Sequence, residues 1–232
     1  MINRRDTLKL CGRTTALMML QQAVGFGFPG SVLYADVSPL TLIDSAGLPL
    51  KAGDLQSGVE SIFFYPHMAT PCFLIDIGSE VAGKTVSLAS GDSYEWEGGV
   101  GKNRSVVAFS AICAHKQSYP SKVKSMIHYN QQNQSIRCCT HDGEFLLREG
   151  GAPTEASPTQ NSLAAVLLNW DPETDHLNVK GMIGPVFFKK FFKRYKSRLR
   201  RGYGSSAKAR SQVTRIEVVP LREYCKKVTA CS

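Results

Sequence analysis

The chain has 232 residues, 43% of them hydrophobic, so it can bury a core, and one main domain with extensions is expected. Its 28 Lys and Arg against 19 Asp and Glu give a formal net charge of +9 at pH 7. Ten of these cations lie between positions 189 and 210 without any acid, and the other 18 balance the acids. This distribution excludes a generally basic protein, and no internal repeat or long low-complexity segment is present.

Residues 1–35 are typical of a targeting segment, a signal or an anchor, and not of a folded domain. Residues 3–9, with the sequence NRRDTLK, resemble a twin-arginine export motif, although the Asn and the Thr depart from it. The uncharged run 14–35 is only moderately hydrophobic, which fits such a signal. Its length would also allow a membrane span, because about 20 apolar residues cross a bilayer. A plain N-terminal amphipathic helix is the alternative.

Short apolar runs bounded by Gly and Pro predict a series of β-strands after a polar linker or edge strand at 36–59. The predicted strands are 61–65, 72–77, 84–88, 106–112, 135–137, 163–170, 177–179 and 216–220. With little helical periodicity between them, they indicate an all-β fold, an antiparallel β-sandwich or open barrel.

Two short motifs follow two of these strands. Cys113 and His115 form a C-x-H pair, and Cys138 and His141, separated from it by 22 residues, form a C-x-x-H pair. Each pair fits one tight loop at a strand end, so the loops are expected to face each other. Thiolates and imidazoles together select zinc or an iron–sulfur centre. Because each half supplies one Cys and one His, the pattern suits two irons with different ligand pairs better than a structural zinc site.

The four positions resemble the Rieske [2Fe-2S] family, and the resemblance extends over residues 60–183. It implies a Rieske-like β-sandwich or open barrel with a cluster-binding subdomain at 112–150. It also implies one [2Fe-2S] cluster. Cys113 and Cys138 would bind one iron, and His115 and His141 would bind the other. A zinc knuckle is the alternative. Cys139 is an alternative to its neighbour Cys138 as a ligand.

The sequence departs from the cytochrome bc-complex branch of that family. Ser118 and Thr140 stand where that branch has a disulfide between its ligand loops, so that disulfide is expected to be absent. Gly143 and Phe145 replace a Ser and a Tyr whose hydroxyls donate hydrogen bonds to sulfur. Because such donors stabilise the reduced cluster, a midpoint potential below the bc-complex range is expected.

Residues 184–212, hereafter the basic segment, are predicted to be an insertion before a C-terminal strand and tail at 213–232. Within 187–201, aromatic residues alternate with cations so that a helix would have one aromatic and one basic face. Such a helix favours contact with a membrane surface or an acidic protein, and nucleic acid is not expected. In the alternative interpretation the aromatic residues pack on the β domain.

The remaining Cys and His indicate no second site. Cys72, Cys139, Cys225 and Cys231 permit disulfides without fixing their pairing, and a strand position favours a buried free thiol for Cys72. Rieske oxygenases add a mononuclear iron held by two His and a carboxylate. The other three His are scattered, so no such iron site and no catalytic residues are expected; they are His67, His128 and His176.

The sequence therefore predicts an exported electron carrier, or an electron-transfer subunit of an oxidoreductase, without a substrate site. It would be periplasmic, soluble or attached to the inner membrane, with a redox donor and acceptor such as an oxidoreductase subunit and a cytochrome. Export through the twin-arginine route fits a cluster that is assembled in the cytosol, because that route carries folded proteins. The alternative is a non-redox zinc-binding module that docks through the basic segment.

Overall fold

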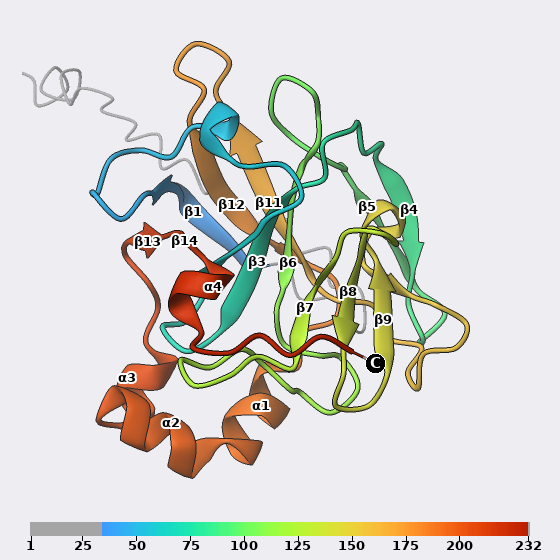
Figure 1. Cartoon of the computed structure of the whole chain (residues 1–232), viewed down its shortest axis with the longest axis vertical. Coiled ribbons are helices and arrows are strands. Elements are labelled where there is room, and N and C mark those ends of the chain that lie inside the picture. Colours follow the sequence, from blue (N-terminus) through green and yellow to red (C-terminus); the bar gives the residue numbers. More distant parts are fainter. Residues whose placement is uncertain (1–33, 232) are drawn as a thin grey trace, which may run out of the picture.

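The computed structural model describes residues 34–231, so the predicted export segment lies outside the described residues apart from its last two (Figure 1). In the described part, none of the helices combines the length and the apolar character that crossing a bilayer requires. The strands make up two larger sheets and one hairpin, and the helices gather near the C-terminal end of the chain.

The largest sheet has eight strands in the order β13-β1-β12-β11-β6-β3-β2-β14. In that order the strands span Ile216–Glu217, Tyr34–Ile43, Leu177–Ile183, Ala165–Trp170, Val106–Ser110, Pro71–Asp76, Glu60–Phe64 and Val219–Pro220. β13 and β14 are separated only by Val218, yet they lie at opposite ends of this order. β13 pairs in parallel with β1 and β14 pairs antiparallel with β2, so this short segment brings both edges together. The sheet is thus a nearly closed barrel, which confirms the predicted all-β fold.

Both faces of the central strands are buried, which explains their continuous apolar runs. All five residues of β6 are buried, and the four apolar ones alternate between two hydrophobic clusters. Val106 and Ala108 join the cluster that extends to the helices of the basic segment. Val107 and Phe109 join the cluster that extends to the smaller sheet. The core therefore connects the barrel to both neighbouring elements.

The smaller sheet carries the second metal-ligand motif. Its four strands follow the order β10-β9-β8-β7. The strands span Ala152–Pro153, Gly143–Leu146, Ser135–Cys138 and Ile127–Asn130. A separate hairpin pairs β4, Lys84–Ser87, with β5, Ser93–Trp96. Two short 3-10 helices span Ala52–Asp54 and Leu147–Glu149. β5, β7, β9 and β10 were not predicted, because each is only two to four residues long and three of them alternate buried with more exposed positions.

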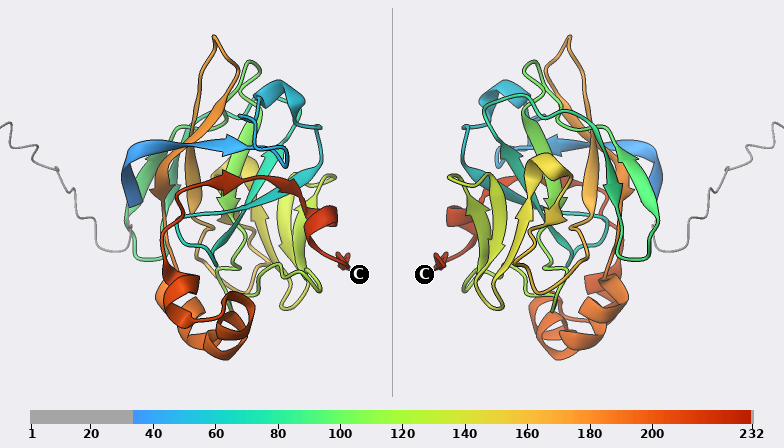
Figure 2. Two further views of the ribbon diagram at one scale, coloured as in Figure 1. Left: turned by 90° about the vertical axis from the view of Figure 1, so that its left-hand side faces the viewer. Right: turned by 90° about the vertical axis from the view of Figure 1, so that its right-hand side faces the viewer.

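The basic segment is helical, as predicted. It forms α1, α2 and α3, and a further short helix, α4, follows β14: Phe188–Arg194, Lys196–Tyr203, Ser206–Arg210 and Leu221–Tyr224. α1–α3 lie together at one end of the β domain, at the bottom of all three ribbon views (Figures 1 and 2). Backbone hydrogen bonds tie their end to the loop after β2, from Met68 to Ser211 at 3.0 Å and from Ala69 to Ala209 at 3.1 Å.

The aromatic face of these helices packs on the β domain, as the alternative interpretation held. Phe191 is fully buried, and its ring meets that of Tyr119 edge-on at 5.0 Å between centroids. Phe188 and Phe192 are also buried, and both contact the ring of His67. Full burial of one such side chain contributes about 1.5–3 kcal/mol. The aromatic residues therefore serve packing, and the cations remain on the outer side.

Candidate metal centre

The first ligand loop, residues 113–118, leaves the buried strand β6 and is closed by its own backbone. The amide of Cys113 donates to the carbonyl of Ser118 at 2.8 Å, and the amide of Gln117 donates to the carbonyl of Cys113 at 2.9 Å. Gln117 has a φ of 54°, in the left-handed region, which turns the chain back on itself. Cys113 is fully buried, and His115 is partly exposed.

The second ligand loop, residues 138–141, joins β8 to β9. Cys138 is the last residue of β8 and is paired with Gly143 of β9, so the loop between them is short and sharply turned. Asp142 has a φ of 52°, and the amide of Cys139 donates to the carbonyl of Met126 at 2.8 Å. The loop is thereby held in the sheet on one side and against the chain preceding β7 on the other.

The two loops bring the predicted ligands together in pairs, cysteine with cysteine and histidine with histidine. The side chains of Cys113 and Cys138 are fully buried and hydrogen-bond each other. The rings of His115 and His141 meet edge-on, 5.3 Å apart and inclined by 80°. The Nδ1 atoms of both rings are buried and have no hydrogen-bond partner among residues 34–231. Each loop therefore contributes one thiol to a buried sulfur pair and one imidazole to a pair of contacting rings.

The environment favours one thiolate in the cysteine pair. The hydrogen bond from Cys113 lowers the pKa of Cys138, and the backbone of Thr140 and the side chains of Ser118 and Thr140 lower it further. The same hydrogen bond and burial raise the pKa of Cys113. The side chains of Ser118 and Thr140 are thus placed as hydrogen-bond donors to the Cys138 sulfur. This role was missed at the sequence level.

Gly143 and Phe145 of β9 carry no hydroxyl that could donate to the site. A Cβ at Gly143 would lie 3.3 Å from the Phe145 ring and 3.8 Å from the sulfur of Cys113. Phe145 itself is fully buried. The glycine therefore leaves space beside Cys113, and the apolar ring of Phe145 forms the neighbouring wall.

The solvent side of the site is positively charged. Burial lowers the pKa of His141, and the positive charges of Lys116 and Arg194, the latter at the end of α1, contribute in the same direction. Both of these cations are exposed. The basic segment therefore reaches the edge of the candidate metal centre, a placement that the sequence did not predict.

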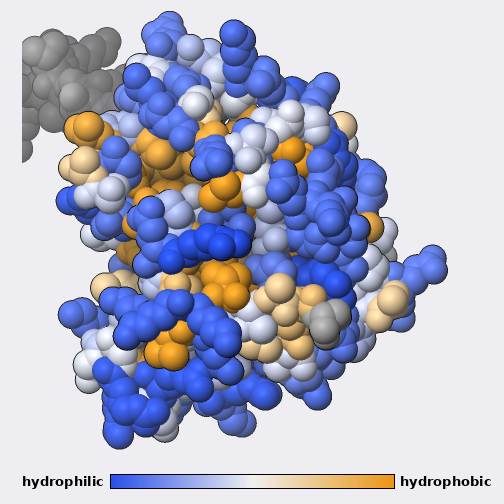
Figure 3. Space-filling model, in the orientation of Figure 1, coloured by the Kyte–Doolittle hydropathy of each residue, from blue (hydrophilic) through white to orange (hydrophobic). Residues whose placement is uncertain are grey.

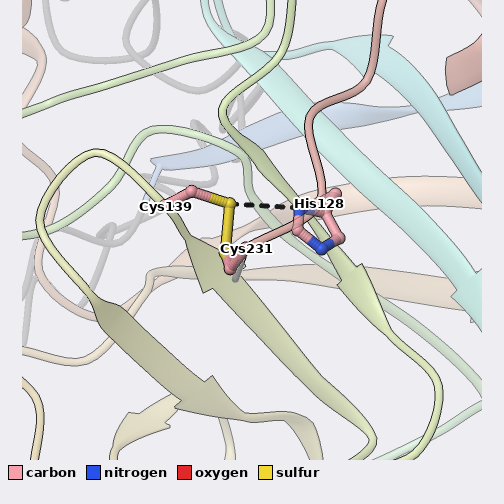
Figure 4. A group of neighbouring side chains, drawn as sticks. All are labelled: His128, Cys139 and Cys231. Atoms are coloured by element: carbon pink, nitrogen blue, oxygen red, sulfur yellow. Dashed lines mark hydrogen bonds between the residues drawn. A yellow bond between two sulfur atoms is a disulfide. The ribbon is translucent and has the colours of Figure 1, made fainter.

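The second ligand loop is also held by a disulfide, shown in Figure 4. Cys139 is bonded to Cys231 in the C-terminal tail, with 4.9 Å between their Cα atoms. The Nδ1 atom of the His128 ring lies 3.8 Å from the Cys139 sulfur. These three residues lie close enough to bind a metal ion, but the sulfur atoms are bonded to each other and provide no thiolate. Cys139 is thus part of a disulfide, whereas its neighbour Cys138 is a free thiol.

The other two cysteines of the described chain are free and buried. Cys72 is a buried thiol as predicted, with its sulfur 3.4 Å from the carbonyl of Tyr65. Cys225 donates to the carbonyl of Ser121 at 2.8 Å. Of the remaining His, His67 packs on the helices of the basic segment, and His176 forms an isolated β-bridge with Lys51.

Comparison with known proteins identifies the segment that carries both loops. The family model of the Rieske [2Fe-2S] domain matches residues 78–167. The soluble domain of Rieske protein II from Sulfolobus acidocaldarius is similar in structure, with 23% identity, a TM-score of 0.44, and coverage of 60% of this chain and 80% of that chain. The ferredoxin of carbazole 1,9a-dioxygenase from Nocardioides aromaticivorans has 18% identity, a TM-score of 0.36, and coverage of 64% and 99%.

The residues present fit the group that this match implies, one [2Fe-2S] cluster. Thiolates and imidazoles are the ligand types of a Rieske centre. The site offers two adjacent buried sulfurs and two buried Nδ1 atoms that make no hydrogen bond within the described chain. A buried polar nitrogen without a partner is costly, so its occurrence on both rings indicates that a ligand completes the site.

Proposed function

We propose that this protein is an exported one-electron carrier, or an electron-transfer subunit, whose single cluster is held by Cys113, Cys138, His115 and His141. The observation that carries the proposal is the convergence of these side chains, with both imidazole Nδ1 atoms unpaired within residues 34–231. The match of the surrounding segment to the Rieske [2Fe-2S] domain supports it. When bound, the cluster supplies reversible transfer of a single electron.

The candidate metal centre has one buried side and one side that is open to solvent. Cys113, Cys138 and Phe145 are fully buried, so they exclude water from the sulfur end of the site. His115 and His141 are partly exposed, which favours their ring edges as the path by which an electron enters and leaves. Burial on one side and access on the other suit a carrier that docks with its partners through the histidine edge.

The ligand proposal prefers Cys138 to its neighbour. Cys138 is a buried free thiol beside Cys113, whereas the sulfur of Cys139 is bonded to Cys231. A sulfur in a disulfide has no thiolate form and therefore cannot serve as a ligand.

An acidic redox partner, such as a cytochrome or an oxidoreductase subunit, is proposed for the histidine edge. Lys116 and Arg194 flank that edge, and both are exposed. The three salt bridges within residues 34–231 all lie outside the basic segment, so no acidic side chain of the described residues forms a salt bridge with its cations. Unpaired charge of one sign speeds the encounter with a partner of opposite sign.

A periplasmic location is proposed from the twin-arginine-like residues 3–9. The Cys139–Cys231 disulfide supports it, because disulfides persist mainly in oxidising compartments. Replacing Arg4 and Arg5 by Lys should retain the protein in the cytoplasm, since Lys lacks the planar guanidinium. Unchanged appearance in the periplasmic fraction would contradict the export proposal.

The function is tested by loading the purified chain with iron and sulfide under anaerobic conditions. Two irons and two acid-labile sulfides per chain, with a Rieske-type EPR signal after reduction, are expected. Replacing Cys113, His115, Cys138 or His141 by Ala should abolish the signal, whereas His128→Ala should retain it. A colourless protein that binds zinc and no iron would favour the zinc-binding module instead.

A further inference from the structure

A cavity of about 830 Å³ lies between α2 and the β domain, beside the first ligand loop. Its apolar wall is formed by Ile62 and Phe64 of β2, Leu199 of α2 and Val219 of β14. Figure 3 shows apolar surface between the hydrophilic helical segment at the bottom and the rest of the molecule. Pockets that bind small molecules span about 300–1,000 Å³, so the volume suits a ligand of that kind.

Three tyrosines converge on this cavity from three different elements. Tyr119 follows the first ligand loop, Tyr203 ends α2, and Tyr224 ends α4. Each is partly buried, and burial raises the pKa of all three phenols, that of Tyr203 to about 12. The phenols therefore stay protonated at neutral pH and act as neutral hydrogen-bond donors.

The polar rim of the cavity is predominantly positive. Arg198, Lys122 and Lys124 line it against a single acid, Glu217. The guanidinium of Arg198 lies 5.7 Å from the centre of the Tyr195 ring, and it lowers the pKa of Tyr119 against the larger effect of burial. The planar guanidinium of Arg198 offers several N–H donors in one plane, which suits a carboxylate or sulfonate.

We propose that this cavity binds a small amphipathic anion. Its aromatic or aliphatic body would lie against Ile62, Phe64 and Leu199, and its carboxylate or sulfonate group would meet Arg198 and the tyrosine hydroxyls. The combination of apolar wall, neutral donors and excess positive charge favours an anion over a neutral or cationic molecule of the same size. The site is separate from the four candidate metal ligands, none of which lines the cavity.

The test is calorimetric titration of the cluster-loaded full chain with two probes of nearly equal shape, 1-naphthalenesulfonate and 1-naphthalenemethanol. The sulfonate is expected to bind at least tenfold more tightly. Arg198→Gln should weaken sulfonate binding at least tenfold, the loss expected for a charge-assisted hydrogen bond. Arg201→Gln is the matched control, because Arg201 is exposed on the same helix and does not line the cavity.

A second variant fills the space without touching the polar groups. Gly202 lines the cavity, and a Cβ there would meet nothing within 4 Å, so Gly202→Trp should fold and block both probes. Gly202→Ala should keep sulfonate affinity within about threefold of the original chain. The absorption spectrum of the cluster checks that each variant folds. Equal binding of the two probes, equal losses in both arginine variants, or no sulfonate binding at 1 mM would overturn the proposal.

Discussion

The two ligand loops are held in different ways. The first is closed by its own backbone, through the hydrogen bonds between Cys113, Gln117 and Ser118, and then continues to Tyr119, which packs on α1. The second is held by partners that are distant in sequence, most of all by the disulfide to Cys231, 92 residues away. The first loop therefore depends on the basic segment next to it, and the second on the C-terminal tail.

The largest effect should separate the two neighbouring cysteines of the second loop. Cys138→Ala should abolish the cluster, because the structure offers no other free thiol beside Cys113 among the described residues. Cys139→Ala should retain the cluster at a lower stability. Iron content and the EPR signal measure both outcomes. A coloured Cys138→Ala protein beside a colourless Cys139→Ala protein would reverse the ligand proposal.

The support of the first loop is tested by Phe191→Ala. Removing this fully buried ring, which contacts Tyr119, should lower the free energy of unfolding by about 3–5 kcal/mol. Urea unfolding of the cluster-loaded protein measures the loss. Lys193→Ala, an exposed change on the same helix, should stay within about 0.5 kcal/mol. Equal small effects of both changes would mean that the basic segment does not support the loop.

The support of the second loop is tested by Cys231→Ser. Loss of the disulfide should lower the free energy of unfolding by about 2–4 kcal/mol, because the reduced unfolded chain gains conformational freedom. The double variant with Cys139→Ser should be no less stable than the single variant by more than about 1 kcal/mol. Stability that does not change in oxidising buffer would contradict a structural role for this disulfide.

A smaller effect should distinguish the hydroxyl donors. Ser118→Ala removes one hydrogen bond to the Cys138 sulfur, worth about 0.5–1.5 kcal/mol, or about 20–60 mV for one electron. The midpoint potential should fall by that amount, because donors stabilise the reduced state. Ser121→Ala, whose hydroxyl donates to the carbonyl of Lys124, is the control in a redox titration. A rise in the Ser118→Ala potential would contradict this role.

The smallest effect concerns the charge at the histidine edge. Arg194→Gln should slow electron transfer to an acidic cytochrome about two- to fivefold at low salt, since exposed charge pairs contribute about 0.2–1 kcal/mol. The difference should vanish at about 1 M salt, where the Debye length is about 3 Å. Arg200→Gln, on α2 and also exposed, should have less effect in stopped-flow measurements. A salt-independent loss would indicate a different cause.

The features that depend on a local sequence pattern could be predicted from the sequence. The runs around Phe73, Phe109 and Leu168 predict strands because most of their residues are apolar and buried, on both faces of the sheet. The two ligand motifs are recognised for the same reason, since Cys113 and His115 lie in one turn and Cys138 and His141 in another.

Features that depend on distant partners could not be predicted in the same way. The pairing of Cys139 with Cys231 joins positions that no local pattern connects. The sulfur-directed hydroxyls of Ser118 and Thr140 appear only once the two loops are adjacent. The aromatic and basic faces of α1 were visible in the sequence, but the choice between packing and docking required the contact with Tyr119. The ligand assignment itself remains a prediction.

The way the barrel closes has a consequence for the order of folding. β1 near the start of the described chain pairs with β12 and with β13, more than 130 residues later, and β14 covers the free edge of β2. Such non-local pairing slows folding, because long loops must close before the contacts form. During synthesis both strand edges stay open until about residue 220 has left the ribosome, and open edges invite aggregation. The barrel is therefore completed only after the segment 216–220 has been made and can pair with both edges.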